Sequence, residues 1–209
     1  MFQTGLKEIL TLAPVVPVVI IEDLADAVPL ARALVAGGLK AIEVTLRTAA
    51  GLEAIRRIAG EVEGAVPGVG TVLTAAQLTA AAQAGAKFAV SPGATPRLLD
   101  AAEASGIAPL PGIATASEAM ALIERGYRYA KFFPAEPSGG APFLAALASP
   151  LPQLTFCPTG GITPANAPSY LKLPNVICVG GSWMLKQDLV KTKNWDAITQ
   201  IARAAAALA

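Results

Sequence analysis

The sequence predicts an α/β protein of the (β/α)8-barrel class, and three observations support this prediction. Short apolar runs recur about every twenty residues. An Ala- and Leu-rich segment with helical periodicity follows most of these runs. Polar residues gather where the runs end, which is where the functional βα loops of a barrel lie. A doubly wound parallel sheet is the rival fold, because alternation of strands and helices alone does not separate the two.

The apolar runs supply the expected strands, at residues 15–20, 41–46, 65–69, 88–90, 108–110, 130–133, 154–157 and 176–179. Helical patterns fill the intervals at residues 26–36, 50–58, 75–84, 96–104, 117–125 and 142–148. We expect an additional N-terminal helix near residues 4–12 and a closing helix at residues 195–208. Glycines stand where several of these helices should end, namely Gly38, Gly60, Gly85, Gly106 and Gly126.

Length and composition indicate a single barrel domain over residues 1–209 that forms subunit contacts. The chain is 54% hydrophobic and only 15% charged, against about 25% charged in an average globular protein. So little charge leaves much of a monomer's surface apolar, which predicts buried contacts between subunits. The net charge is +1 without a basic cluster, so we expect no nucleic acid partner.

Several classes of function are excluded or disfavoured by the residues present. Histidine is absent, which excludes Ser-His-Asp and Cys-His catalysis and any histidine-based metal site. Cys157 and Cys178 lack metal-ligand spacing, and they fit small core residues in a reducing cytoplasm. The apolar stretch at 12–21 is too short for a membrane span. The Gly-Val-Gly at 68–70 lacks the third glycine of a dinucleotide fingerprint, which argues against a nicotinamide or flavin. From these residue patterns together we expect neither a metal nor a cofactor.

The second expected strand carries polar residues on one face. Glu43, Thr45 and Arg47 alternate with apolar residues, and side chains two apart on a strand point to the same side. In a barrel that side is the interior. A carboxylate and a guanidinium there form either a structural ion pair or part of a site, and taken alone the two interpretations are about equal.

Lys131 stands in an apolar strand, where lysine is a poor packing residue. It could pair structurally with Glu43 or extend outward. Alternatively it is an imine-forming amine kept among the aromatic side chains that follow it. Strands two and six lie opposite each other in an eight-stranded barrel and contribute to the same interior layer. Glu43 is therefore expected to reach Lys131.

Two glycine pairs follow strands seven and eight, at Gly160-Gly161 and at Gly180-Gly181, the second pair leading into Ser182. Glycine allows backbone N–H groups to approach an anion closely, and the loops after these two strands are the recurrent phosphate site of (β/α)8 barrels. The alternative is that the glycines only make tight turns. The pattern favours a phosphate site.

With these residues identified, the chain resembles the class I 2-keto-3-deoxy-6-phosphogluconate aldolases, a family that includes 4-hydroxy-2-oxoglutarate aldolase activity, over nearly its whole length. The matching segments are residues 43–48, 70–73, 91–93, 111–112, 131–136, 157–162 and 180–183. The resemblance implies that Lys131 is the Schiff-base lysine and Glu43 the general acid/base. It places Arg47 and Thr71 at the pyruvate carboxylate. The other residues implied to surround the substrate are Pro92 and Phe133 at the keto acid, with Thr159, Gly160, Gly161, Gly181 and Ser182 toward the distal hydroxyl and phosphate.

The resemblance further implies a lyase of the Entner-Doudoroff pathway. Such an enzyme cleaves the phosphorylated 2-keto acid 2-dehydro-3-deoxy-6-phosphogluconate to pyruvate and glyceraldehyde 3-phosphate, and a second expected reaction splits 4-hydroxy-2-oxoglutarate to pyruvate and glyoxylate. It also implies a TIM-barrel homotrimer, and we expect a cytoplasmic location. Two alternatives remain: a phosphate-binding barrel isomerase or synthase without imine chemistry, and a non-catalytic barrel that binds a phosphorylated metabolite.

Overall fold

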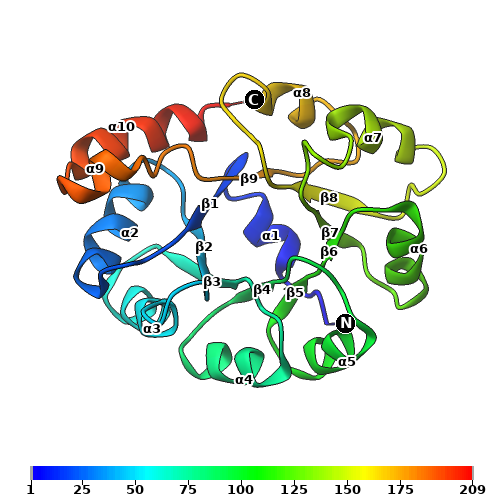
Figure 1. Ribbon diagram of the computed structural model, residues 1–209, viewed down its shortest axis with the longest axis horizontal. Helices are drawn as coiled ribbons and strands as arrows, with labels where there is room; N and C mark the ends of the chain where they lie inside the picture. Colours follow the sequence, from blue (N-terminus) through cyan, green and yellow to red (C-terminus); the bar gives the residue numbers. More distant parts are fainter. Residues whose placement is uncertain (1, 209) are drawn as a thin grey trace.

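The computed structural model describes residues 2–208 as strands that alternate with helices (Figure 1). The strands are β1 Val15–Val19, β2 Ala41–Thr45, β3 Val66–Gly70, β4 Phe88–Val90, β5 Ala108–Leu110, β6 Gly112–Ile113, β7 Tyr129–Phe132, β8 Thr155–Pro158 and β9 Val179–Gly181. The helices are α1 Leu6–Leu10, α2 Ala27–Ala36, α3 Gly51–Glu61, α4 Ala75–Gln83, α5 Pro96–Ala104, α6 Ala116–Glu124, α7 Gly140–Leu147, α8 Ala167–Leu171, α9 Gln187–Lys191 and α10 Trp195–Ala206, with a 3-10 turn η1 at Leu24–Asp26.

The strands form a curled parallel sheet. One part has the order β5-β4-β3-β2-β1-β9 and the other the order β6-β7-β8. Figure 1 shows α2 to α8 and α10 along the outside of the curl, with α1 near its centre. Helices along one side of a curled parallel sheet make a half-barrel, whereas a doubly wound sheet carries helices on both faces.

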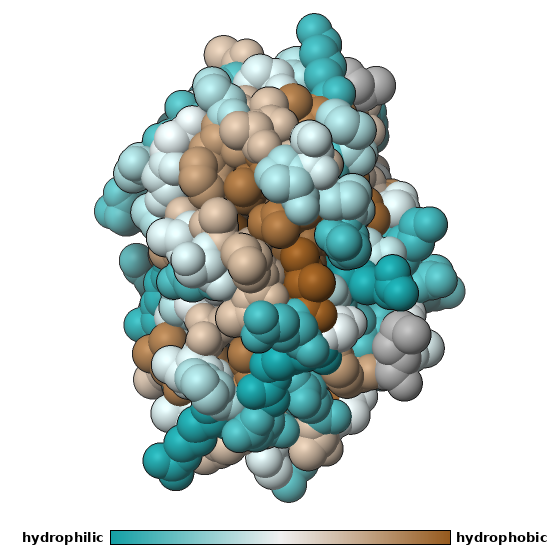
Figure 2. Space-filling view, turned by 90° about the vertical axis from the view of Figure 1, so that its right-hand side faces the viewer, coloured by the Kyte–Doolittle hydropathy of each residue, from teal (hydrophilic) through white to brown (hydrophobic). Residues whose placement is uncertain are grey.

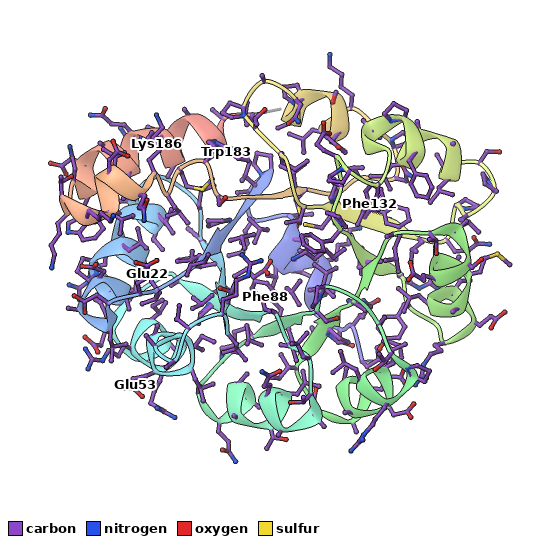
Figure 3. All side chains as sticks on the ribbon, viewed as in Figure 1. Glu22, Glu53, Phe88, Phe132, Trp183 and Lys186 are labelled. Atoms are coloured by element: carbon purple, nitrogen blue, oxygen red, sulfur yellow. The ribbon has the colours of Figure 1, made fainter. Side chains whose placement is uncertain are left out.

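Apolar side chains form two cores, one on each side of the curled sheet. The larger core packs strands against the outer helices. The smaller one lies inside the curl and includes Leu6 and Leu10 of α1 together with Phe88 of β4. Figure 3 places Phe88 inside the curl, whereas Glu53 and Lys186 lie at the periphery. Each fully buried leucine contributes about 1.5–3 kcal/mol of transfer free energy, so α1 is fixed by its apolar face.

Gln3 ties the segment before α1 to the strands. Its side-chain amide donates to the carbonyl oxygens of Pro109 and Tyr129, both at 2.8 Å. Its amide oxygen accepts from the backbone N–H of Arg128 at 2.8 Å. The side chain is buried. These bonds bridge the starts of β5 and β7, which belong to the two separately paired parts of the sheet.

Threonines at the starts of α4, α5 and α6 explain where these helices begin. The side chains of Thr74, Thr95 and Thr115 each accept a hydrogen bond from a backbone N–H in the first turn. Such a cap contributes about 1 kcal/mol to helix stability. The three helices therefore begin where the sequence offers a capping hydroxyl.

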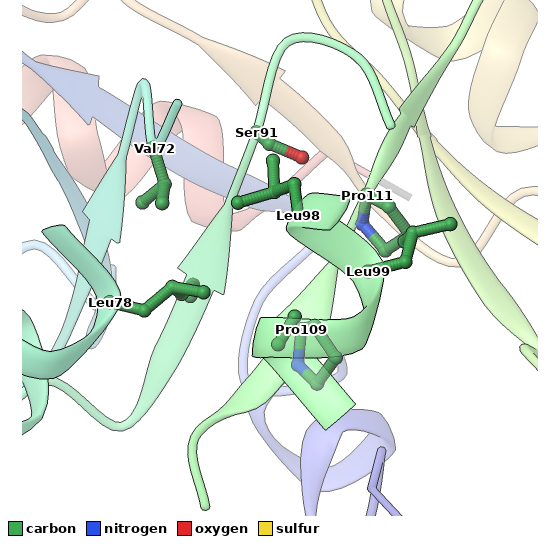
Figure 4. A pocket seen from close by; sticks show the side chains of 9 residues that line it. Val72, Leu78, Ser91, Leu98, Leu99, Pro109 and Pro111 are labelled. Carbon is green, nitrogen blue, oxygen red and sulfur yellow. The ribbon is translucent and has the colours of Figure 1, made fainter. Parts of the chain in front are cut away.

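A small apolar cavity lies between the β3–β5 region and helices α4 and α5 (Figure 4). Leu78, Leu98 and Ser91 are among its lining residues, and its volume is about 10 Å³. A space of this size holds about one water molecule. It is therefore a packing defect of the outer core and cannot hold a substrate. No described helix is long and apolar enough to cross a membrane.

Several element boundaries differ from those predicted. The fifth expected strand continues beyond Pro111 as β6. The last strand begins at Val179 rather than at residue 176, because Val176 makes only an isolated bridge to Phe156. Gly60 lies inside α3 and does not end it; Gly64, with a φ of 79°, takes the left-handed turn after that helix.

Candidate active site

Lys131 and Glu43 form a buried ion pair inside the curled sheet. Lys131 Nζ lies 3.3 Å from Glu43 Oε1, and the two residues are only 4% and 3% exposed. Lys131 is on β7 and Glu43 on β2, so the expected contact between these two strands is present. Removing two charges from water costs several kcal/mol each, and a close pair only partly offsets that cost. Such a pair in an interior core suits chemistry better than stability.

Phe133 contacts the lysine from one side. Lys131 Nζ lies 5.2 Å from the centroid of the Phe133 ring. An aromatic face attracts a cation and excludes water from it. The same ring borders the glycine pair after β8, since a Cβ built on Gly160 would lie 3.3 Å from Phe133 Cδ2. Phe133 thus joins the lysine to the loop predicted to hold phosphate.

Glycine in β3 provides the space for Glu43. A Cβ built on Gly70 would overlap the Glu43 carboxylate. Gly70 and Thr45 are register partners on neighbouring strands, which brings the end of β3 beside the carboxylate. The adjacent Gly68 gives similar room to the Phe88 ring. The small residues of β3 therefore allow a carboxylate and an aromatic ring to share the interior.

Arg47 and Thr71 follow the neighbouring strands β2 and β3. Their loops are joined by a 2.9 Å bond from the backbone N–H of Leu46 to the carbonyl of Gly70. Thr71 is half-buried with a φ of 60°, a left-handed conformation that costs a non-glycine residue about 1–3 kcal/mol. Arg47 is exposed and makes no ion pair within residues 2–208. The guanidinium is therefore available to an anion from solution.

The backbone carbonyl groups of the loop after β8 are hydrogen-bonded to the protein. The carbonyl of Thr159 accepts from Ala135 N at 2.8 Å, and that of Gly160 accepts from Glu136 N at 3.1 Å. Gly160 and Gly161 have φ values of 101° and 79°, which side chains rarely tolerate. Among the described residues, no protein group accepts from the N–H of either glycine. Two unpaired N–H groups in succession suit an anion.

The loop after β9 lies next to this one. Thr159 is buried and forms a bridge with Gly180, whose Cβ position is occupied by the threonine side chain. The Trp183 ring covers Gly181, and Ser182 is exposed beside it. Ser182 also borders a cavity of about 420 Å³ together with Val18 and Ile20 from β1 and the segment after it. Its lining includes the acidic residues Glu22, Asp23 and Asp26 but neither Lys131 nor Glu43, so this cavity is distinct from the ion-pair cluster.

Pro92, after β4, is half-buried, and its carbonyl oxygen occupies the space where Gly112 of β6 would carry a Cβ. Successive contacts join Glu43, Lys131, Phe133 and Gly160 into one cluster. Arg47, Thr71, Pro92 and Ser182 lie on loops that follow the strands β2, β3, β4 and β9. No group of three His, Cys, Asp or Glu suited to a metal occurs among the described residues.

Three residues at the β8 loop were not predicted as site residues: Glu136 and Asn166, which contact the loop, and Tyr170, which bonds to Glu136. The Tyr170 hydroxyl donates to Glu136 Oε1, and Asn166 Nδ2 donates to the carbonyl of Gly161 at 3.0 Å. Burial, and then the bond to Glu136, raises the pKa of the Tyr170 hydroxyl above its usual value. The bond between Tyr170 and Glu136 joins residues 34 positions apart, so no local pattern predicts it.

Cys157 and Cys178 are free and buried inside the curl, as predicted for core residues. The neighbouring Cys157, together with burial, raises the pKa of the Cys178 thiol. A thiol with a raised pKa is a poor nucleophile, since the thiolate is the reactive form. Both cysteines pack in the inner core, and the Cys178 thiol is unsuited to act as a nucleophile.

Comparison with known proteins gives one consistent family. The model of the KDPG and KHG aldolase family matches residues 6–201. The 2-dehydro-3-deoxy-phosphogluconate aldolase of Pseudoalteromonas atlantica is 52% identical over 206 residues, covering 99% of this chain and 96% of that protein. The KHG/KDPG aldolase of Escherichia coli is 50% identical over 204 residues, covering 98% and 96%.

Solved structures agree with the sequence comparison. The KDPG aldolase of Legionella pneumophila, with pyruvate captured at low pH as a covalent carbinolamine intermediate, has a TM-score of 0.93 at 44% identity and covers 96% of this chain and 98% of its own. The Zymomonas mobilis ZM4 aldolase with 3-phosphoglycerate has a TM-score of 0.93 at 49% identity, covering 99% and 97%. With this match along nearly its whole length, the chain belongs to the KDPG and KHG aldolase family.

Proposed function

We propose that this protein is a class I aldolase that cleaves 2-dehydro-3-deoxy-6-phosphogluconate to pyruvate and glyceraldehyde 3-phosphate. The single observation that carries the proposal is the buried contact of 3.3 Å between Lys131 Nζ and Glu43 Oε1. An amine and a carboxylate placed together in a water-poor interior are the two groups that imine chemistry needs. Relatives about 50% identical carry this activity in their names.

Imine formation uses the pair directly. Lys131 passes a proton to Glu43 and attacks C2 of the keto acid as the neutral amine. Glu43 returns this proton to the C2 oxygen, which gives a carbinol. Glu43 then transfers a second proton from the nitrogen to the hydroxyl, so that water leaves and a protonated imine remains on Lys131. The Phe133 ring, 5.2 Å from Nζ, excludes water from one side of the reacting nitrogen.

The imine then accepts the electron pair of the bond that breaks. Glu43, directly or through a water, removes the proton of the C4 hydroxyl, and the C3–C4 electron pair moves toward the imine nitrogen. Glyceraldehyde 3-phosphate leaves, and an enamine of pyruvate stays on Lys131. Protonation at C3 and hydrolysis release pyruvate and restore the amine. One carboxylate thus serves successive proton transfers, consistent with its position 3.3 Å from the lysine.

Arg47 and Thr71 hold the carboxylate of the keto acid in this proposal. A guanidinium binds a carboxylate through two parallel hydrogen bonds and fixes its orientation. The exposed Arg47 and the strained Thr71 follow adjacent strands next to Glu43. Pro92 and Phe133 border the pyruvyl part of the substrate.

The loops after β8 and β9 receive the distal hydroxyl and the phosphate. The N–H groups of Gly160 and Gly161, with the exposed Ser182 and the backbone at Gly181, supply donors for a dianion. Thr159 fixes the two loops against each other. The phosphate donors favour the phosphorylated substrate over 4-hydroxy-2-oxoglutarate, which we propose as a second substrate with the same pyruvyl half.

We also infer that the two parts of the sheet close into one eight-stranded barrel in a single domain. Supporting this, Lys131 N donates to Pro111 O at 2.8 Å between β7 and the β5–β6 junction, and parallel bridges join Phe156 to Val176 and Thr159 to Gly180. β5 and β6 then count as one strand interrupted at Pro111.

We propose that the protein works as a homotrimer in the cytoplasm. Figure 2 displays apolar side chains gathered on the side of the molecule that carries α6 and α7. Met120 of α6 is a large apolar residue that is 52% exposed. Contiguous exposed apolar surface is typical of a contact between subunits. The free cysteines suit a reducing compartment.

The direct test is to supply 2-dehydro-3-deoxy-6-phosphogluconate and measure pyruvate and glyceraldehyde 3-phosphate. We expect equimolar products from the wild type and none from Lys131→Arg, which keeps the charge but cannot form the imine. Lys87→Arg, on the segment before β4, is the matched control. Activity that survives in Lys131→Arg would instead favour a barrel enzyme without imine chemistry. Binding of the substrate without products in the wild type would favour a non-catalytic binding barrel.

A further inference from the structure

Glu136 lies across the loop that we propose for phosphate. A Cβ built on Gly161 would lie 2.7 Å from Glu136 Cγ and 2.8 Å from its Cβ, so the methylene groups of Glu136 occupy the space beside this glycine. The backbone N–H of Glu136 also donates to the carbonyl of Gly160 at 3.1 Å. The residue therefore supports both glycines, one through its backbone and the other through its side chain.

The carboxylate end of Glu136 points away from the glycines. Its Oε1 accepts from the hydroxyl of Tyr170, a fully buried residue of α8. The same oxygen is 3.4 Å from a Cβ built on Gly140, the first residue of α7. A negative charge is favourable near the start of a helix. The charge is thus directed toward α7 and α8, and the uncharged methylenes face the phosphate loop.

Asn166 fixes the other end of the same loop. Its Nδ2 donates to the Gly161 carbonyl at 3.0 Å, and its Oδ1 accepts from Thr163 N at 2.7 Å. The carbonyl groups of both glycines are therefore bonded to protein. A peptide plane whose carbonyl is fixed has its N–H direction fixed as well. The bond from Ala135 N to the Thr159 carbonyl therefore fixes the N–H of Gly160, and the bond from Glu136 N to the Gly160 carbonyl fixes the N–H of Gly161. The Asn166 bond holds the next peptide plane, at the end of the glycine pair.

We propose that Glu136 and Tyr170 are positioning residues for the phosphate end of the substrate. This inference rests on the proposed function. Tyr170 orients Glu136, the methylenes of Glu136 hold Gly161, and the glycine pair presents its N–H groups to the phosphate. Glu136 and Tyr170 thereby raise the affinity for the phosphorylated substrate and leave imine formation at Lys131 unaffected. Neither residue touches the reacting atoms.

The test compares Tyr170→Phe, Glu136→Ala and Glu136→Gln with the wild type. Tyr170→Phe removes one hydroxyl, and Glu136→Ala removes the methylenes next to Gly161. Glu136→Gln keeps the methylenes and an oxygen that accepts from Tyr170. The control is Tyr127→Phe, a second buried tyrosine whose ring lies 4.5 Å from that of Phe2, outside the β8 loop. Each variant is first checked for folding by circular dichroism and thermal unfolding.

The measurements are KM and kcat for 2-dehydro-3-deoxy-6-phosphogluconate and the rate of pyruvate trapping by borohydride. We expect Tyr170→Phe and Glu136→Ala to raise KM about tenfold, the effect of one lost hydrogen bond of ordinary strength to an ionised group. Pyruvate trapping should be unchanged in both, and Glu136→Gln and Tyr127→Phe should resemble the wild type.

An unchanged KM in folded Tyr170→Phe and Glu136→Ala would overturn the inference, and so would an equal loss in pyruvate trapping. Failure of the wild type to trap pyruvate would overturn the proposed function itself. The two failures are therefore distinguishable in the same set of samples.

Discussion

The carboxylate of Glu43 rests against the α-carbon of Gly70, in the space that a β-carbon would occupy. This contact limits where the carboxylate can lie, and its Oε1 is 3.3 Å from Lys131 Nζ. The backbone of β3 therefore limits the positions that the carboxylate of Glu43, the proposed acid/base group, can take. A change of one carbon atom in β3 should reach the chemistry without altering either charged residue.

Gly70→Ala should reduce kcat about 100-fold, because an acid/base group displaced by about 1 Å loses that much. Steady-state release of pyruvate measures the effect. Gly93→Ala is the matched control, since no atom lies within 4 Å of the position that its Cβ would take. A folded Gly70→Ala protein with wild-type kcat would show that the position of Glu43 does not limit the reaction.

Thr71→Gly should stabilise the protein and weaken it as a catalyst. Thr71 has a φ of 60°, and glycine removes a strain of about 1–3 kcal/mol. Glycine also adds freedom to the unfolded chain, so we expect a net gain of about 1 kcal/mol in the free energy of unfolding. The hydroxyl proposed to hold the substrate carboxylate is lost, so KM should rise. Urea unfolding and steady-state kinetics measure the two effects. A free energy of unfolding below that of the wild type would contradict the backbone strain assigned to Thr71.

Arg47→Lys should lose activity although it keeps the positive charge. Lysine replaces a two-point contact to the substrate carboxylate by one, and a hydrogen bond to a charged group contributes about 1.5–3 kcal/mol. We therefore expect kcat/KM to fall about 10- to 150-fold. Arg56→Lys on α3, where the arginine pairs with Glu53, is the control. Wild-type kcat/KM in Arg47→Lys would remove Arg47 from the proposed site.

Gln3→Ala should destabilise the fold while leaving kcat unchanged. Gln3 is buried and bonds to backbone groups at Pro109, Arg128 and Tyr129. Loss of these bonds leaves buried polar groups without partners, so we expect the free energy of unfolding to fall by about 2–4 kcal/mol. Urea unfolding of Gln3→Ala and of the exposed Gln187→Ala gives the comparison. Equal stability of the two variants would contradict the role of Gln3 as a tie between strands.

Sequence periodicity predicted the parts of the fold that depend on local patterns. The run at 88–90 is β4 and the run at 108–110 is β5. A short apolar run between two helical patterns is typical of a buried parallel strand. The pairing of Lys131 with Glu43 also followed from the sequence, since alternation along strands fixes which side chains face the interior. The contact spans 88 positions, but the barrel class places the two strands opposite each other and so made it predictable.

Other features could not be predicted because no periodic pattern or fold rule specifies them. Gln3 bonds to Pro109 across 106 positions, and Tyr170 bonds to Glu136 across 34. Gly60 looked like a helix end, but α3 continues to Glu61 and the left-handed turn falls at Gly64. A glycine is compatible with a helix end without requiring one. Tertiary contacts therefore decide the partners of Gln3 and Tyr170, whereas the end of α3 is a local difference between two nearby glycines.

The most direct test of the proposed mechanism is to incubate the protein with pyruvate and borohydride and to map the modified peptide by mass spectrometry. Borohydride reduces an imine to a stable amine, which marks the lysine that formed it. The account predicts a pyruvyl-derived adduct on Lys131 that is absent without pyruvate. A folded protein with no adduct, or with an adduct only on exposed lysines such as Lys87 or Lys186, would contradict the Schiff-base mechanism.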